Sequence, residues 1–196
     1  MVNVLVDYPW HPWAVKKYGQ ETHDLLDEIF WKSGYWEGLD LGTVSPEEFL
    51  EKCYALRPGH EELIRGIFWE VGECASLFPY TIPWIQELKK QGYQVLLLSN
   101  YPDFIRDLRP DVLEFLPYMD GGFFSCDIHM VKPHADIFHH ICKAYGLEPA
   151  ECLFIDDNLE NVRSARECQL HAIQFLGYEK TYPEICDYLE QRSDKK

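Results

Sequence analysis

The stretch LFIDDNLENV, residues 153–162, decides the fold class of this chain. It starts with a short, continuous apolar run, which is typical of a strand buried on both faces of a parallel sheet. The run ends in Asp156, Asp157 and Asn158, and apolar residues at helical spacing follow. A buried strand that leads through polar residues into a helix indicates one unit of an α/β protein.

The same pattern recurs along the chain. A helix is predicted over residues 84–91, and the apolar run 93–98 after it ends at Ser99 and Asn100. Residues 137–145 predict a helix that stops at Gly146, and further strands are predicted at residues 152–155 and 171–176. Strands that alternate with helices predict a parallel sheet with helices on both faces.

The segment from residue 13 to residue 78 lacks this alternation. Its apolar residues have helical spacing and predict three or four helices. Ser45, followed by Pro46 and two acids, is a helix start signal with a hydroxyl N-cap.

Composition and charge restrict the function classes. The chain has 196 residues, of which 46% are hydrophobic, and a formal net charge of -15. That charge repels nucleic acid and anionic membranes, so we predict a small ligand and neither of those partners. No apolar run approaches the roughly 20 residues of a membrane span, and the first residues lack the basic region of a signal peptide, so we predict a cytoplasmic protein. The seven scattered cysteines are interpreted as reduced thiols.

Ligands of parallel sheets sit at the carboxyl ends of the strands, so the residues there are candidates for chemistry. Asp156 and Asp157 suit Mg²⁺, which takes one or two carboxylates together with waters and phosphate; alternatively they cap the following helix. Ser99 is either a helix N-cap or, with the Asn100 N–H, a donor to a phosphate oxygen. Lys132 either is a solvated surface lysine or points its ammonium into the same crevice.

In this order, three motifs resemble those of the haloacid dehalogenase (HAD) superfamily. They are LLLSN at residues 96–100, KPHADIF at residues 132–138, and LFIDDNLENV. The segment YWEGLDLGTVSPEEF, residues 35–49, is similar to the cap signature of a helical-cap subgroup that contains phosphatases of the alpha-D-glucose-1-phosphate phosphatase type.

The resemblance implies a Rossmann-like core, residues 1–12 and 79–196, with an inserted α-helical cap, residues 13–78. It implies a Mg²⁺-dependent phosphatase of a small phosphorylated metabolite that acts through a phospho-aspartate intermediate.

It also assigns roles to single residues. Asp157 would coordinate Mg²⁺ directly and Asp156 would assist, with Asn158 and Asn161 orienting the acidic pair. Ser99, the Asn100 backbone and Lys132 would hold the phosphoryl group.

The catalytic aspartate of the first motif has two possible positions. Aligned with the subgroup's FDMGNVLLDY, the chain places the nucleophile immediately before Met1 and makes Asp7 a flanking acid, which implies a longer natural protein or a pseudoenzyme. In another register, residues 2–6 form the central strand and Asp7 is the nucleophile. That register needs a tight turn after Asp7, and the presence of Pro9 and the lack of a glycine there are unfavourable for such a turn.

Two other functions compete with phosphatase activity. A pseudophosphatase or metabolite-binding module would explain an absent nucleophile, and a dehalogenase would use the same scaffold. The adjacent carboxylates favour the metal-dependent phosphatase over the dehalogenase. Cap aromatics such as Trp31 and Trp36 either line a pocket or, as is commoner at helical spacing, belong to the core.

Overall fold

The computed structural model describes residues 1–193, and they divide into two compact units. One unit comprises residues 5–131, and the other joins residues 1–4 to residues 132–196. The core-and-cap boundaries given above cut the chain elsewhere and stay a prediction.

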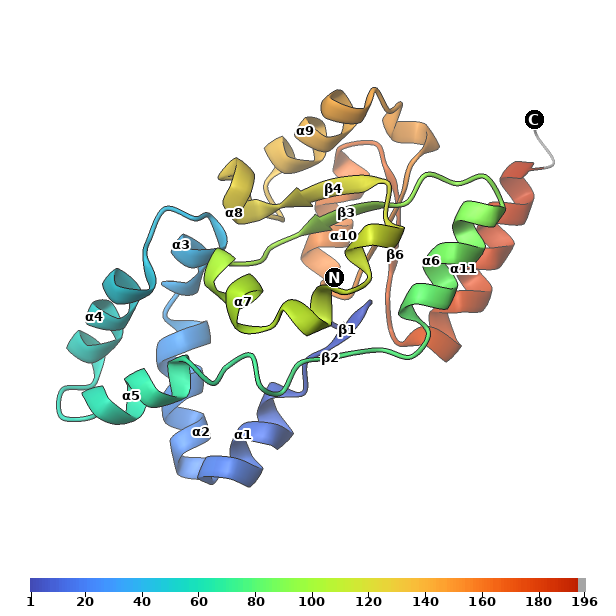
Figure 1. Ribbon diagram of the computed structural model, residues 1–196. Coiled ribbons are helices and arrows are strands. Elements are labelled where there is room, and N and C mark those ends of the chain that lie inside the picture. Colours follow the sequence, from blue (N-terminus) through green and yellow to red (C-terminus); the bar gives the residue numbers. More distant parts are fainter. Residues whose placement is uncertain (194–196) are drawn as a thin grey trace. The chain divides into compact units, whose positions relative to one another are not determined.

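The unit of residues 5–131 is rich in helices (Figure 1). Its helices are α1 (Trp10–Tyr18), α2 (Gln20–Leu26), the π-helical η1 (Asp27–Lys32), α3 (Trp36–Asp40), α4 (Pro46–Leu56), α5 (Glu61–Phe68), α6 (Thr81–Lys90), α7 (Asp103–Leu108), the 3-10 turns η2 (Pro110–Leu113) and η3 (Leu116–Tyr118), and α8 (Ser125–Ile128). Its strands are β1 (Val6–Asp7), β2 (Ser76–Leu77), β3 (Leu96–Ser99) and β4 (Gly121–Phe124).

Helix α4 begins where the sequence predicts. Ser45 accepts the N–H of Glu48, and the Glu48 carboxylate accepts the Ser45 N–H in return, at 2.8 Å. This capping box satisfies two N–H groups that the first turn leaves without a helical partner.

Aromatic rings form the core between these helices. The rings of Phe68 and Phe104 stack with centroids 4.7 Å apart, and Phe49 lies 5.3 Å from Phe68. Trp36 meets Phe49 edge-on at 5.5 Å and is itself only partly buried, at the margin of this core. Buried rings of this size are the main source of stability in such a layer.

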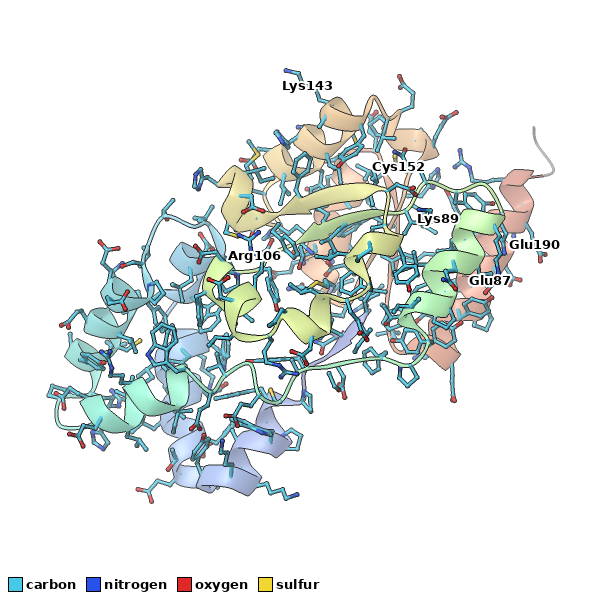
Figure 2. The ribbon with its side chains drawn as sticks, in the orientation of Figure 1. Glu87, Lys89, Arg106, Lys143, Cys152 and Glu190 are labelled. Carbon is cyan, nitrogen blue, oxygen red and sulfur yellow. The ribbon has the colours of Figure 1, made fainter. Side chains whose placement is uncertain are left out.

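Strands β3 and β4 pair in parallel and lie side by side (Figure 1). Sequence reasoning missed β4, because its Gly121 and Gly122 are typical of a turn. A side chain at Gly122 would collide with the Leu97 backbone, so the glycine permits this close approach. Arg106 of α7, labelled in Figure 2, fixes the segment after β4 through paired bonds of 2.9 and 2.8 Å to Asp127.

The unit of residues 1–4 and 132–196 has the predicted alternation. Its elements are α9 (Ala135–Tyr145), the 3-10 turn η4 (Pro149–Glu151), β5 (Leu153–Asp156), α10 (Leu159–Glu167), β6 (His171–Gln174) and α11 (Tyr178–Ser193). Strands β5 and β6 are parallel neighbours, with α10 connecting them, and Phe138 of α9 packs its ring edge against Phe154 at 5.2 Å. The α/β class and its parallel strands are thus as predicted.

The central strand that the alternative register places over residues 2–6 does not form. Asn3 has φ +57°, in the left-handed region, and the Val4 N–H closes a turn on the Met1 carbonyl. Strand β1 starts only at Val6 and pairs antiparallel with β2, so Asp7 does not end a central parallel strand. Asparagine adopts left-handed backbone more readily than most residues, and the pattern of apolar residues around Asn3 does not indicate this conformation.

Candidate active site

The residues at the end of β5 form a buried charged cluster within the smaller unit. Asp156 is 2% exposed and lies 2.6 Å, through Oδ2, from Nζ of Lys132, which is 6% exposed. The other oxygen, Oδ1, accepts the Asn161 side-chain amide at 2.9 Å and the Asn158 backbone N–H at 3.0 Å. Both oxygens of this carboxylate are therefore held.

Two of the alternatives offered by the sequence are settled here. Lys132 is buried and is not a solvated surface lysine. The N-cap of α10 is Asn158, whose side chain accepts the Glu160 N–H at 2.8 Å, so neither Asp156 nor Asp157 is the cap. The Asn161 side chain and the Asn158 backbone N–H both contact Asp156, while the prediction that these residues orient the acidic pair stays a prediction.

Asp157 is held less tightly than its neighbour. Its Oδ2 accepts the side-chain amide of Asn3 at 2.8 Å, and its backbone carbonyl accepts the Gln174 amide at 3.0 Å. Side chains alternate along a strand, so the two carboxylates of an Asp-Asp pair leave the sheet in different directions. One carboxylate is thus locked, while its neighbour is held at the surface.

The amino group of Met1 lies in the same cluster. Burial and, to a smaller extent, the neighbouring Lys132 charge lower its pKa to about 5, while Asp156 and Asp157 oppose the shift. Burial by itself raises the pKa of Asp156, but the Lys132 and Met1 charges and the hydrogen bonds of Lys132 and Asn161 outweigh it, so this pKa lies below its ordinary value. Asp156 is an ionised carboxylate at neutral pH.

The sequence missed Asn3 and the Met1 amino group. Asparagine between two valines carries no motif spacing, and its left-handed conformation is visible only in the structure. The signal that could have found it is the alignment of MVNVLVDY with the first motif, which runs through Asn3.

The remaining predicted residues lie in the other unit. Ser99 ends β3 at 2% exposure, and its hydroxyl donates to the Asn100 carbonyl at 3.2 Å. Asp7 lies on β1 opposite Ser76. The roles of Ser99, Asn100 and Asp7 stay predictions, whereas Lys132, Asp156 and Asp157 are gathered in one unit.

The donor set fits a hard divalent cation. Adjacent carboxylates with room for water and a phosphate oxygen are how Mg²⁺ is commonly held, and Asp157 is the better placed of the two for direct contact. No group of three or more His, Cys, Asp or Glu side chains within residues 1–193 has the arrangement of a metal site, so Asp156 and Asp157 would share the ion with waters and substrate.

Comparison with known proteins gives the family. The model of the haloacid dehalogenase-like hydrolases matches residues 11–169. The chain belongs to this family. Several relatives are named phosphatases or hydrolases, which supports a hydrolase at the level of the family. Among the residues that the structure describes, none of the helices has the length and apolar character that a membrane span needs.

Two curated relatives and one solved structure illustrate the likeness. The chain is 32% identical over 139 residues to sesquiterpene phosphatase astK of Aspergillus oryzae, covering 67% of each chain. It is 26% identical over 152 residues to flavin mononucleotide hydrolase 1 of Arabidopsis thaliana, covering 78% of this chain and 61% of the relative. A HAD family enzyme of Bacteroides thetaiotaomicron, solved with magnesium and inorganic phosphate, has the same fold, with a TM-score of 0.67, 22% identity, and coverage of 89% of this chain and 90% of its own.

Proposed function

We propose that this HAD-like hydrolase is a Mg²⁺-dependent phosphatase of a small phosphorylated metabolite. The observation that carries the proposal is the buried Lys132–Asp156 pair beside Asp157. In a chain of net charge -15, an anionic ester needs a local cation, and the Lys132 ammonium, with three N–H donors, supplies one.

In this proposal, different residues bind the phosphoryl group and the metal ion. Asp156 holds Lys132 in place, so that the positive charge of the ammonium attracts an oxygen of the transferred phosphoryl group. Mg²⁺, held by Asp157 and assisted by Asp156, supplies neutralisation of phosphoryl charge when it is bound. Ser99 and the Asn100 N–H add uncharged donors in this proposal. Phosphoryl transfer depends mainly on such positioning and charge neutralisation.

The attacking carboxylate is proposed to be the residue that the first motif places before Met1, giving a phospho-aspartate intermediate. The Met1 amino group lies beside Lys132 and Asp156, which supports this position. The names of the relatives suggest phosphate monoesters with large organic groups, such as a terpenoid phosphate or flavin mononucleotide, as first substrates to test.

The experiment measures phosphate release from a panel of metabolites by two proteins, the 196-residue chain and a version with Phe-Asp added before Met1. We expect turnover by the extended version in Mg²⁺, its loss in EDTA, and a loss of at least 100-fold on Asp157→Asn. An exposed control, Asp136→Asn, is expected to leave the rate unchanged. An inactive extended protein across the panel would count against phosphatase activity.

A second candidate is metabolite binding without turnover. It is favoured by one observation, that the buried pair of Lys132 and Asp156 can hold a phosphate oxygen without an attacking carboxylate. Calorimetry with inorganic phosphate and Mg²⁺ would then show saturable binding while neither protein releases phosphate. EDTA-sensitive turnover by the 196-residue chain would exclude this candidate, and Asp7→Asn would then test Asp7 as the nucleophile.

A further inference from the structure

A chain of hydrogen bonds joins α1 to α2 within the unit of residues 5–131, and none of its residues has been assigned a role above. Nδ1 of His11 lies 3.1 Å from Nε2 of His23, and Nδ1 of His23 lies 2.9 Å from Oδ1 of Asp24. The Gln20 side-chain amide donates to the same Asp24 oxygen at 2.7 Å. His23 is 5% exposed, whereas His11 is exposed, so one end of this chain is buried and the other open to solvent.

The carboxylate settles the tautomer of His23. Asp24 is an exposed carboxylate, and its Oδ1 accepts the hydrogen bonds of both the Gln20 amide and the His23 ring. Nδ1 of His23 therefore carries the proton, and Nε2 presents a lone pair to His11. A carboxylate behind the second nitrogen of a histidine is the usual partner of metal-ligating imidazoles.

The ring geometry favours convergence on a common point over a straight N–H···N bond. The imidazole planes are at 90° and their centroids are 4.4 Å apart. A straight bond of this length would hold the centroids roughly 5.3 Å apart, because both nitrogens would lie on the line between the rings. Two nitrogens 3.1 Å apart subtend about 100° at an ion with bonds of roughly 2.05 Å, close to the tetrahedral value.

We propose that His11 Nδ1 and His23 Nε2 bind a divalent transition-metal ion of the Zn²⁺ type, with Asp24 orienting His23 and water completing the coordination. The proton between the rings moves to His11 Nε2 as the ion enters, so the number of bound protons does not change. The ion reaches the pair through the exposed His11 ring. Imidazole nitrogens select Zn²⁺ over Mg²⁺, so this site is chemically distinct from the oxygen ligands Asp156 and Asp157.

The test is calorimetric titration of the 196-residue protein with Zn²⁺ in excess Mg²⁺, which occupies oxygen sites. We expect one saturable site in the wild type, at least tenfold weaker binding in His11→Gln, and roughly tenfold weaker binding in Asp24→Asn. The matched control is His139→Gln, an exposed histidine of α9, which should bind as the wild type does. Circular dichroism checks that each variant is folded.

A second measurement, NMR of the wild-type protein, tests the same site without any substitution. With ¹⁵N-histidine labelling, Zn²⁺ should shift the resonances of His11 Nδ1 and His23 Nε2 and leave those of His139 in place. Binding by His11→Gln equal to that of the wild type would assign the Zn²⁺ to another group, such as a cysteine, and would overturn the proposal. So would the lack of any saturable heat in the wild type.

Discussion

Replacing Lys132 by methionine tests the buried ion pair, because it removes one charge and leaves the other. Asp156 would remain 2% exposed with no lysine at Oδ2. Removing one member of a buried pair typically costs about 3–5 kcal/mol. We expect a loss of about 3 kcal/mol at pH 8, the low end of this range, because Asn161 and the Asn158 N–H still hold Oδ1 and the Met1 amino group also faces the carboxylate.

The pH dependence of this loss gives the sharper result. In the wild type the folded pKa of Asp156 is lowered, so its stabilising contribution is present above the unfolded value, near 3.9, and is lost as the pH falls through the folded pKa. Without Lys132, burial dominates and raises the folded pKa, so Asp156 destabilises the fold increasingly as the pH rises above about 4. The cost of Lys132→Met should therefore be smaller at pH 5 than at pH 8.

Urea unfolding followed by far-UV circular dichroism measures these values. All six tryptophans lie within residues 5–131, so fluorescence would report on the other unit. The control is Lys143→Met on α9, an exposed lysine labelled in Figure 2, with an expected change within about 0.5 kcal/mol. The double variant Lys132→Met, Asp156→Asn should cost less than the sum of the single variants by about 2 kcal/mol. Additive costs, or a cost of Lys132→Met that grows toward pH 5, would refute the reasoning.

Three further predictions concern stability, and all are measured by urea unfolding. Ser45→Ala removes the capping box with Glu48 and should cost about 1 kcal/mol, and retention of full stability would contradict the cap's role. Phe138→Ala, at a fully buried ring, should cost about 3–5 kcal/mol, and a cost below about 1 kcal/mol would mean that this core collapses around the cavity. The Met1 amino group has a pKa of about 5 in the folded protein against an ordinary value of 8.0, so it binds its proton more readily in the unfolded chain. It should therefore make the 196-residue chain more stable as the pH rises from 5 to 8, by at most about 4 kcal/mol. A contribution of the opposite sign would contradict the burial of this group.

The sequence predicted the elements that one strong periodicity or cap defines. Strands β5 and β6 and helix α9 follow from apolar runs and a terminal glycine, and α4 follows from Ser45. It failed at β4, where two glycines are required by a close backbone approach to β3 and look like a turn. At residues 2–6 the sequence left two registers open, and the left-handed Asn3 interrupts the apolar run that one of them needs as a strand.

Prediction of the candidate sites from the sequence was limited in the same way, because spacing along the chain does not give the packing of one element on another. Motif spacing identified Lys132, Asp156 and Asp157, because residues at the ends of parallel strands and in the following loops converge. The pair His11 and His23 has no metal-ligand spacing along the chain, and only the packing of α1 on α2 brings their nitrogens to 3.1 Å. Contacts made by neighbouring helices depend on helix rotation, which a single apolar stripe does not fix to within one residue.

The two adjacent carboxylates at the end of β5 have different surroundings, although they belong to one sequence motif. Asp156 spends both oxygens on Lys132, Asn161 and the Asn158 N–H, and these bonds keep it ionised in a buried position. Asp157 is bound by the amide of the exposed Asn3, a contact that a cation with its waters can replace at little cost. The repulsion between the two adjacent charges is therefore small, because Lys132 neutralises the first and the Asn3 amide binds the second. The order of the pair follows from strand geometry: the residue that ends the strand points into the packed sheet, and the next one is already in the loop.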